Sequence, residues 1–253
     1  TRTFLAVTGE QYTHLTPIYR SSSPDGPWLP ADSGLSYGST GNLLKQGIYR
    51  IARCGYRMLA AGNRIASTRF PEVTWIINQD VGYVGDQRVH LEQSEQDSSV
   101  FVFSANTQVQ MDIIVFSQDT GHSWKTLPLP HPPVNSAAAM LAIGLSPNSR
   151  GEVLLATSDG FLRGAEFGKI WSDTINVHKQ WVRCFAYGSD SIDHVWAGGS
   201  AFLFSEDDGL HWRIIDTPLA TGSIINHMLS MPLDGMLYLG SSIGVYRMNK
   251  RGL

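Results

Sequence analysis

The chain has little charge and no long apolar run. Asp, Glu, Lys and Arg make up 16% of its 253 residues, and its formal net charge is −3. Binding to nucleic acid by phosphate neutralisation needs a strongly basic surface, so this composition argues against a nucleic-acid partner. The longest apolar stretch, AAAMLAIGL at 137–145, is far shorter than the roughly 20 residues that span a bilayer. We therefore expect no membrane insertion.

Motifs that carry chemistry are equally scarce. The eight histidines are scattered and show no spacing typical of a zinc site. The string GSSIG at 240–244 matches a nucleophile elbow, but it precedes the strand-like VYRMN rather than a helix, so Ser242 is interpreted as a turn serine. The three acids in SEDDG at 205–209 are interpreted as a solvated turn. The sequence therefore predicts no catalytic residue, no metal site and no cofactor.

The sequence does contain a repeated four-point pattern. SQDTGHSW at 117–124 and SEDDGLHW at 205–212 place serine, aspartate, glycine and tryptophan at offsets 0, 2, 4 and 7. The copies consist of Ser117, Asp119, Gly121 and Trp124, and of Ser205, Asp207, Gly209 and Trp212. GAEFGKIW at 164–171 is an eroded copy that keeps Glu166, Gly168 and Trp171. SSPDGPW before Trp28 is a compressed version, and STRFPEVTW before Trp75 is stretched by one residue and lacks the acid.

The spacing of these patterns indicates a repeat protein. The tryptophans at 28, 75, 124, 171 and 212 are separated by 47, 49, 47 and 41 residues. The last segment, at 236–253, follows the same template up to the expected position of its tryptophan, which makes six repeats.

Each repeat reads as short strands. Runs such as WVRCFAYGS (181–189), HVWAGG (194–199) and FLFSE (202–206) are rich in branched and aromatic residues and bounded by small polar ones. Four antiparallel strands per repeat predict an all-β fold, a β-propeller over residues 1–253 as a single domain. Six blades fit best, and five or seven remain open. The pattern begins near the second strand of the first repeat and ends after the third strand of the last, so two of 24 strands are absent from it. The ring of blades could close by irregular pairing of the two ends, by a composite blade, or by a strand from a partner chain.

The pattern S-x-D-x-G-x-x-W resembles the Asp box, or bacterial neuraminidase repeat, of sialidases, sortilin-type propellers, photosystem assembly propellers and many bacterial and phage propellers. The resemblance implies a propeller whose boxes lie at the periphery, and it implies no activity. The glycine can adopt a positive φ, the serine and aspartate can bond to the local backbone, and the tryptophan can pack between sheets. We interpret the box residues as structural.

A sialidase-like hydrolase is the sharpest enzymatic alternative that this resemblance implies. Such enzymes resemble one another in a Phe/Tyr-Arg-Ile-Pro motif that supplies the first of three arginines. YRIA at 49–52 is similar but ends in alanine and follows the first box-like turn. Arg50 is interpreted instead as a solvated or paired cation on an inner strand.

The sequence therefore predicts a non-catalytic binding or assembly module. Its partners are expected to be other protein chains of a larger particle, such as a phage virion, with a glycan-binding lectin-like propeller as the alternative. Cys54 and Cys184 fall on opposite blades of a six-bladed ring and are expected to be free thiols. The sequence shows no charged-then-apolar leader, so synthesis in the cytoplasm is expected. Two segments, LPLPHPPV at 127–134 and residues 29–47, are candidate docking or recognition loops.

Overall fold

The chain folds into two compact units. Unit 1 comprises residues 1–93 and 98–126, and unit 2 comprises residues 94–97 and 127–253. The computed structural model describes residues 4–7, 18–31, 33, 48–54, 56–62, 64–69, 72, 74–80, 89–93, 101–106, 112–126, 140–146, 152–157, 160–166, 169–172, 181–188, 193–216, 219, 222–231 and 235–249. The predicted single domain over residues 1–253 stays a prediction.

Unit 1 contains three antiparallel sheets, each with its strands in chain order. The first sheet consists of β1 (Phe4–Val7), β2 (Ile18–Ser21) and β3 (Leu29–Pro30). The second consists of β4 (Ile48–Cys54), β5 (Arg57–Gly62), β6 (Arg64–Arg69) and β7 (Ile76–Asp80). The third consists of β8 (Val89–Gln93), β9 (Phe101–Asn106), β10 (Asp112–Ser117) and β11 (Lys125–Thr126).

Unit 2 contains three more sheets of the same kind. The fourth sheet consists of β12 (Met140–Leu145), β13 (Val153–Thr157), β14 (Gly160–Ala165) and β15 (Ile170–Trp171). The fifth consists of β16 (Val182–Tyr187), β17 (Val195–Gly199), β18 (Phe202–Ser205) and β19 (Arg213–Ile214). The sixth consists of β20 (Ile225–Ser230), β21 (Met236–Ser241) and β22 (Gly244–Asn249).

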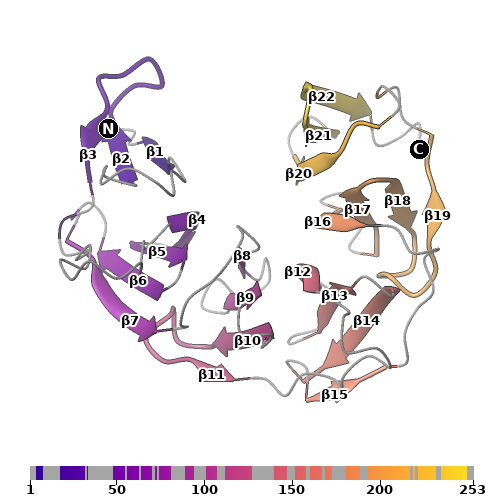
Figure 1. Cartoon of the computed structure of the whole chain (residues 1–253), viewed down its shortest axis with the longest axis horizontal. Coiled ribbons are helices and arrows are strands. Elements are labelled where there is room, and N and C mark those ends of the chain that lie inside the picture. Colours follow the sequence, from indigo (N-terminus) through magenta and orange to yellow (C-terminus); the bar gives the residue numbers. More distant parts are fainter. Residues whose placement is uncertain are drawn as a thin grey trace. The chain divides into compact units, whose positions relative to one another are not determined.

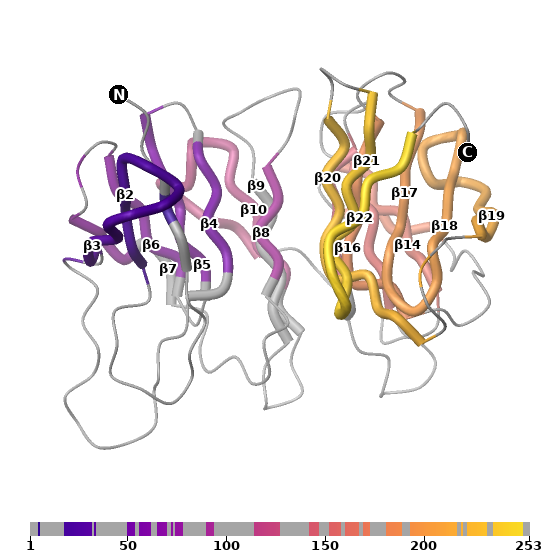
Figure 2. The backbone as a smooth tube through the Cα atoms, turned by 90° about the horizontal axis from the view of Figure 1, so that it is seen from above, coloured from indigo at the N-terminus to yellow at the C-terminus, as the bar shows by residue number. Residues whose placement is uncertain are grey.

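Within each unit the sheets are arranged like propeller blades. Their first strands lie side by side, β4 with β8 in unit 1 and β12 with β16 and β16 with β20 in unit 2, while the last strands lie at the outside (Figure 1). Figure 2 shows the strands of each unit running in one general direction, so the turns gather at the two ends of the unit. The described part of the chain contains no helix, and so none that could cross a membrane. The all-β prediction is confirmed, and so are the strands expected within 181–189, 194–199 and 202–206.

The first and sixth sheets have three strands among the described residues. β3 follows the turn that ends at Trp28, so it takes the place of a fourth strand, and the described residues of the first sheet include no counterpart of β4. The last described strand of the sixth sheet is β22, the counterpart of β18. The described strands therefore number 22, as the sequence pattern predicted.

The core lies between neighbouring sheets. The short apolar runs of β13 and β17 are buried at every position. Phe161, Val182 and Leu203 belong to one cluster that joins the fourth and fifth sheets. Each such side chain contributes roughly 1.5–3 kcal/mol when fully buried, so packing between sheets, rather than the short β ladders, holds each unit together.

Several features singled out in the sequence lie outside the described residues. These are Gly168, the side chain of Cys54, the segment 127–134 and most of 29–47. Cys184 is described and forms no disulfide with the described part of the chain, in agreement with the prediction; its sulfur lies 3.6 Å from the carbonyl oxygen of Gly198.

Candidate functional site

The turn from Ser117 to Trp124 joins β10 to β11 and is organised by a buried serine. Ser117 Oγ donates to Asp119 Oδ1 at 2.8 Å and accepts from the backbone nitrogen of Gly121 at 2.9 Å. The Asp119 nitrogen lies 3.3 Å from the same Oγ. One hydroxyl thus fixes the conformation of five consecutive residues.

Asp119 completes the turn by accepting from the residues that follow it. Its Oδ1 accepts from the backbone nitrogens of His122 at 3.0 Å and Ser123 at 2.9 Å, and its Oδ2 accepts from Ser123 Oγ at 2.6 Å. Burial raises the pKa of this carboxyl, but the hydrogen bonds from Ser123, Ser117 and His122 outweigh it and lower the pKa to about 2. The carboxylate therefore accepts its hydrogen bonds from residues of its own turn.

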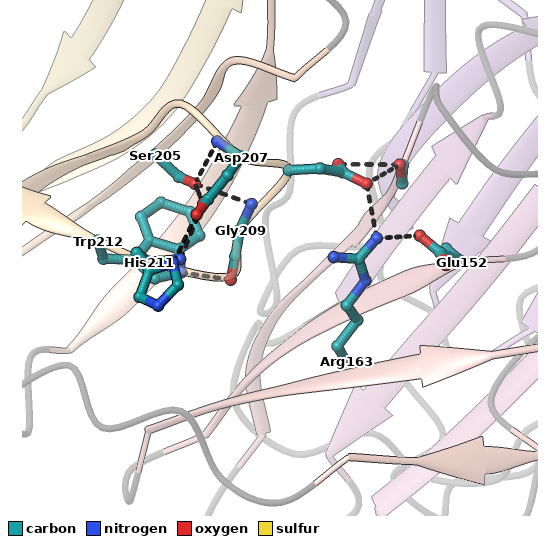
Figure 3. Close-up of polar contacts among 9 residues, drawn as sticks. Glu152, Arg163, Ser205, Asp207, Gly209, His211 and Trp212 are labelled. Carbon is teal, nitrogen blue, oxygen red and sulfur yellow. Dashed lines mark hydrogen bonds and ion pairs between the residues drawn. The ribbon is translucent and has the colours of Figure 1, made fainter.

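The turn from Ser205 to Trp212 has the same geometry (Figure 3). Ser205 Oγ donates to Asp207 Oδ1 at 2.8 Å and accepts from the Gly209 nitrogen at 2.9 Å. The His211 nitrogen donates to Asp207 Oδ1 at 2.8 Å, and its ring Nδ1 lies 2.6 Å from Oδ2, where the other copy has the Ser123 hydroxyl. Burial raises the Asp207 pKa, but the bonds from His211 and Ser205 give a net lowering.

Each complete turn packs on the preceding sheet through its glycine. Gly121 and Gly209 have φ values of 79° and 84°, which favour glycine. A Cβ on Gly121 would lie 2.6 Å from Leu59 Cδ2 on β5, and one on Gly209 would lie 2.9 Å from Leu154 Cδ1 on β13. We call these two contacts the unit 1 seam and the unit 2 seam. The absence of a side chain allows the turn and the neighbouring sheet to approach closely.

The tryptophan closes the turn. Trp212 Nε1 donates to the Gly209 carbonyl at 2.8 Å, and Trp124 Nε1 donates to the Gly121 carbonyl at 3.2 Å. The Trp212 ring packs edge-on against Phe161 of the fourth sheet, with centroids 4.8 Å apart. Trp212 therefore links its own turn to the neighbouring sheet.

The first and second sheets contain turns of the same length that the sequence pattern placed differently. Strand pairing ends at Arg20 with Leu29 and at Ser67 with Ile76. The turns therefore run over 21–28 and 68–75, and both are eight residues long, neither compressed nor stretched. Ser21 and Thr68 supply a buried hydroxyl at the first position. The sequence pattern missed this agreement because the second turn begins with a threonine instead of a serine and the glycine of the first turn is shifted by one position.

The strand pairing places Glu166 and Trp171 of the eroded copy differently from their counterparts in the complete turns, while Gly168 lies outside the described residues. Ala165 pairs with Ile170 and Gly164 with Trp171, so a four-residue turn joins β14 to β15. Trp171 lies in the strand itself, and Glu166 is an exposed residue at φ 48° whose carboxylate is 3.5 Å from Lys169 Nζ. The first turn position holds Glu166 instead of a hydroxyl residue, so the hydrogen bonds that organise the longer turn are not available.

The unit 2 seam carries an ionic cluster that the sequence did not predict. Asp208 is only 6% exposed, and it was expected to be solvated. Both of its carboxylate oxygens accept from Ser146 Oγ at 2.9 Å, and Oδ2 also accepts from Arg163 Nη2 at 2.8 Å. The same guanidinium contacts Glu152 (Figure 3). Because Asp208 belongs to the fifth sheet and the other three residues of the cluster to the fourth, the cluster holds the two sheets together.

Polar side chains also lie on the first strands of the sheets. Burial raises the pKa of the half-buried Glu92 on β8 to about 7, against the opposing effect of the Arg50 charge on β4. In unit 2, Arg183 on β16 donates to Asn226 Oδ1 on β20 at 2.9 Å. Arg50 thus lies on a first strand beside a carboxyl group, as expected for a paired cation on an inner strand.

Comparison with known proteins identifies the fold. No family model and no curated protein matches this sequence. The structure is similar to that of YCF48 from Cyanidioschyzon merolae, with a TM-score of 0.67, 13% identity, and coverage of 93% of this chain and 77% of that one. It is also similar to YCF48 bound to a D1 peptide, with a TM-score of 0.66, 13% identity, and coverage of 91% and 71%.

A third similarity is to the GH74 enzyme of Niastella koreensis, with a TM-score of 0.62, 13% identity, and coverage of 82% of this chain. This chain spans about a third of that enzyme, since the match covers 36% of it. These structures are β-propellers, so the chain has the propeller arrangement of antiparallel blades.

Proposed function

We propose that the protein is a non-catalytic binding and assembly module in which the six sheets serve as six blades of one propeller. The observation that carries the proposal is an apolar residue repeated on the outer strands. Leu29, Ile76, Ile170 and Ile214 lie on β3, β7, β15 and β19, and each is between 54% and 66% exposed. Isolated exposed apolar residues are ordinary. Their recurrence at the outer strands of four sheets supports a perimeter that contacts other protein chains.

The carboxylates of the two complete turns, 117–124 and 205–212, which we call the box turns, support the same proposal. The oxygens of Asp119 and Asp207 accept hydrogen bonds from their own turns. They have a structural role that is complete without a ligand. A similarly folded chain, YCF48, binds a D1 peptide, which is consistent with a protein partner. The proposal that this protein belongs to a larger particle, such as a phage virion, rests on the short, compact repeats of the sequence.

The absolute mass of the purified chain across a dilution series tests the proposal. We expect a stable oligomer, or a complex with a co-expressed partner, and we expect the double variant Ile170→Ser/Ile214→Ser to weaken it. Leu210→Ser is the matched control, because Leu210 is 49% exposed but lies in a turn rather than on an outer strand. A chain that stays monomeric at 27.8 kDa in every mixture would contradict the assembly role.

A glycoside hydrolase is the second candidate, because Glu92 has the raised pKa that a general acid needs near neutral pH. The similar structures include GH74 enzymes, one of them a xyloglucanase from Xanthomonas campestris. Hydrolysis of xyloglucan or of a sialoside that is lost in Glu92→Gln would favour this candidate. Binding to a glycan panel without hydrolysis would instead favour the lectin-like alternative.

A further inference from the structure

The unit 1 seam contains two arginines that face each other. Arg57 begins β5 and Arg69 ends β6, and the two residues pair directly across the strands. Like charges at directly opposite positions are unfavourable unless something compensates them. The pairing therefore raises the question of which anion balances this site.

Neither guanidinium contacts a carboxylate in the described part of the chain. Arg57 Nη2 donates to Ser67 Oγ at 2.7 Å, and its Nη1 contacts the His122 ring on the neighbouring turn. The Arg69 guanidinium carbon lies 5.4 Å from the centroid of the Tyr56 ring, which is 64% exposed. The Arg57 side chain is thus held in place by the Ser67 hydroxyl and the His122 ring, and Arg69 is exposed beside it.

The unit 2 seam shows what the same position contains when an anion is present. Leu154 on β13 is the counterpart of Leu59 on β5, because each packs against the glycine of a complete box turn. Counting from these leucines along the paired strands and turns, Glu152 takes the place of Arg57, Arg163 that of Ser67, and Asp208 that of Thr120.

The two seams therefore differ in charge. In unit 2 the turn inserts the Asp208 carboxylate, which contacts the Arg163 guanidinium at 2.8 Å. In unit 1 the turn inserts Thr120, with almost the same backbone, since φ is 60° at Thr120 and 54° at Asp208. A guanidinium is present at both seams, but among the described residues a carboxylate of the turn contacts it only at the unit 2 seam.

The sequence around the unit 1 seam is basic over a long stretch. Residues 45–71 contain no aspartate or glutamate, although the whole chain has a net charge of −3. The six basic residues of this stretch are Lys45, Arg50, Arg53, Arg57, Arg64 and Arg69. The local positive charge favours an anionic ligand, and it is too small and too isolated for the extended phosphate contacts of nucleic acid.

We propose that Arg57 and Arg69 bind the carboxylate of an acidic segment of a partner protein at the unit 1 seam. This inference rests on the proposed function, for which it supplies the chemistry of the partner. Planar guanidinium groups bind carboxylates through paired, charge-assisted hydrogen bonds. The His122 ring and Ser67 hold the Arg57 guanidinium in position, the exposed Arg69 meets the ligand, and the partner's carboxylate takes the place that Asp208 fills in unit 2.

Fluorescence anisotropy with a labelled Gly-Asp-Glu-Asp-Glu-Gly peptide tests the site. We expect saturable binding at low salt that is absent for the neutral Gly-Asn-Gln-Asn-Gln-Gly peptide. Arg69→Gln should weaken binding at least about tenfold, since one charge-assisted bidentate pair is lost. Arg213→Gln is the matched control, because Arg213 is also an exposed arginine over an aromatic ring, 5.0 Å from the Phe204 centroid, and it should change affinity less than twofold.

A second variant distinguishes a binding site from a merely structural cluster. Thr120→Asp supplies the missing carboxylate from the chain itself, at a backbone conformation that Asp208 shows to be compatible with aspartate. It should abolish peptide binding while leaving the chain folded or raising its midpoint of thermal unfolding. Unchanged peptide affinity in both Arg69→Gln and Thr120→Asp would overturn the proposal, as would equal binding of the neutral peptide.

The same experiment separates this inference from the proposed function. A labelled oligonucleotide that competes as well as the acidic peptide would overturn the carboxylate assignment in favour of a general anion site. If the wild-type chain forms its oligomer or complex but does not bind the acidic peptide, only the unit 1 seam assignment fails. If it stays monomeric in every mixture, the assembly role fails regardless of the peptide result.

Discussion

Ser205→Ala is the sharpest test of the box turn as a structural element. Ser205 is 1% exposed, and its hydroxyl accepts from the Gly209 nitrogen at 2.9 Å and donates to Asp207 Oδ1 at 2.8 Å. Alanine removes the hydroxyl and leaves the buried Gly209 N–H without its acceptor. Water has no access to replace it, because Gly209 is itself buried.

The size of the effect follows from these two losses. An unsatisfied buried donor costs about 1–3 kcal/mol, and the bond to a charged aspartate contributes about 1 kcal/mol more. We therefore expect Ser205→Ala to lower the free energy of unfolding by about 2–4 kcal/mol. Ser117→Ala removes the same bonds in unit 1, at 2.9 Å and 2.8 Å, and should cost a similar amount. The two turns are independent, so the losses should add.

Urea denaturation followed by tryptophan fluorescence measures both variants, and amide hydrogen exchange at Gly209 reports the local loss directly. Ser22→Ala is the control, because Ser22 is exposed and has no hydrogen bond in the part of the chain that the structure describes. A loss below about 0.5 kcal/mol for Ser205→Ala, or unchanged protection at Gly209, would refute the reasoning.

Three further predictions concern the pH dependence of stability, the glycine contact and the ionic cluster. Because the Glu92 pKa is raised from 4.5 to about 7, the chain loses stability as the pH rises from 4.5 to 7. Glu92→Gln should remove this dependence and stabilise the chain at pH 8 by at most about 3 kcal/mol. Equal midpoints of urea unfolding for the wild type and this variant at pH 8 would contradict the burial of the carboxyl group. Gly121→Ala should cost about 2 kcal/mol, from its φ of 79° and its contact with Leu59, while Gly222→Ala, at φ 84° with open space around it, should cost only about 1 kcal/mol. Asp208→Ala should cost about 2–3 kcal/mol in thermal unfolding, since it leaves a partly buried guanidinium with one carboxylate instead of two.

The sequence by itself determined the repeat, the strands and the chemistry of the complete box turns. The bonds of these turns are local: Ser205 reaches two and four residues along the chain, and Asp207 reaches four. Spacing in the sequence therefore fixes the geometry of such a turn without reference to the rest of the fold. Local reasoning also found the strands within 181–206, because runs of four to eight branched and aromatic residues bounded by small polar ones are typical of buried strands.

The tertiary structure decided everything that depends on distant partners. Asp208 reads as a solvated turn acid in the sequence, but Arg163 and Ser146, 45 and 62 residues away, make it a buried link between sheets. The turn before Trp171 keeps the spacing of the pattern but pairs as a four-residue hairpin, since strand register, and not the tryptophan, sets the turn length. Likewise, Arg57 and Arg69 are 12 residues apart in an unremarkable basic stretch, and only strand pairing places them face to face. Hydrogen bonds between residues a few positions apart can be predicted from the order of residues. The charge balance of a seam cannot, because it arises only when two sheets bring their side chains together.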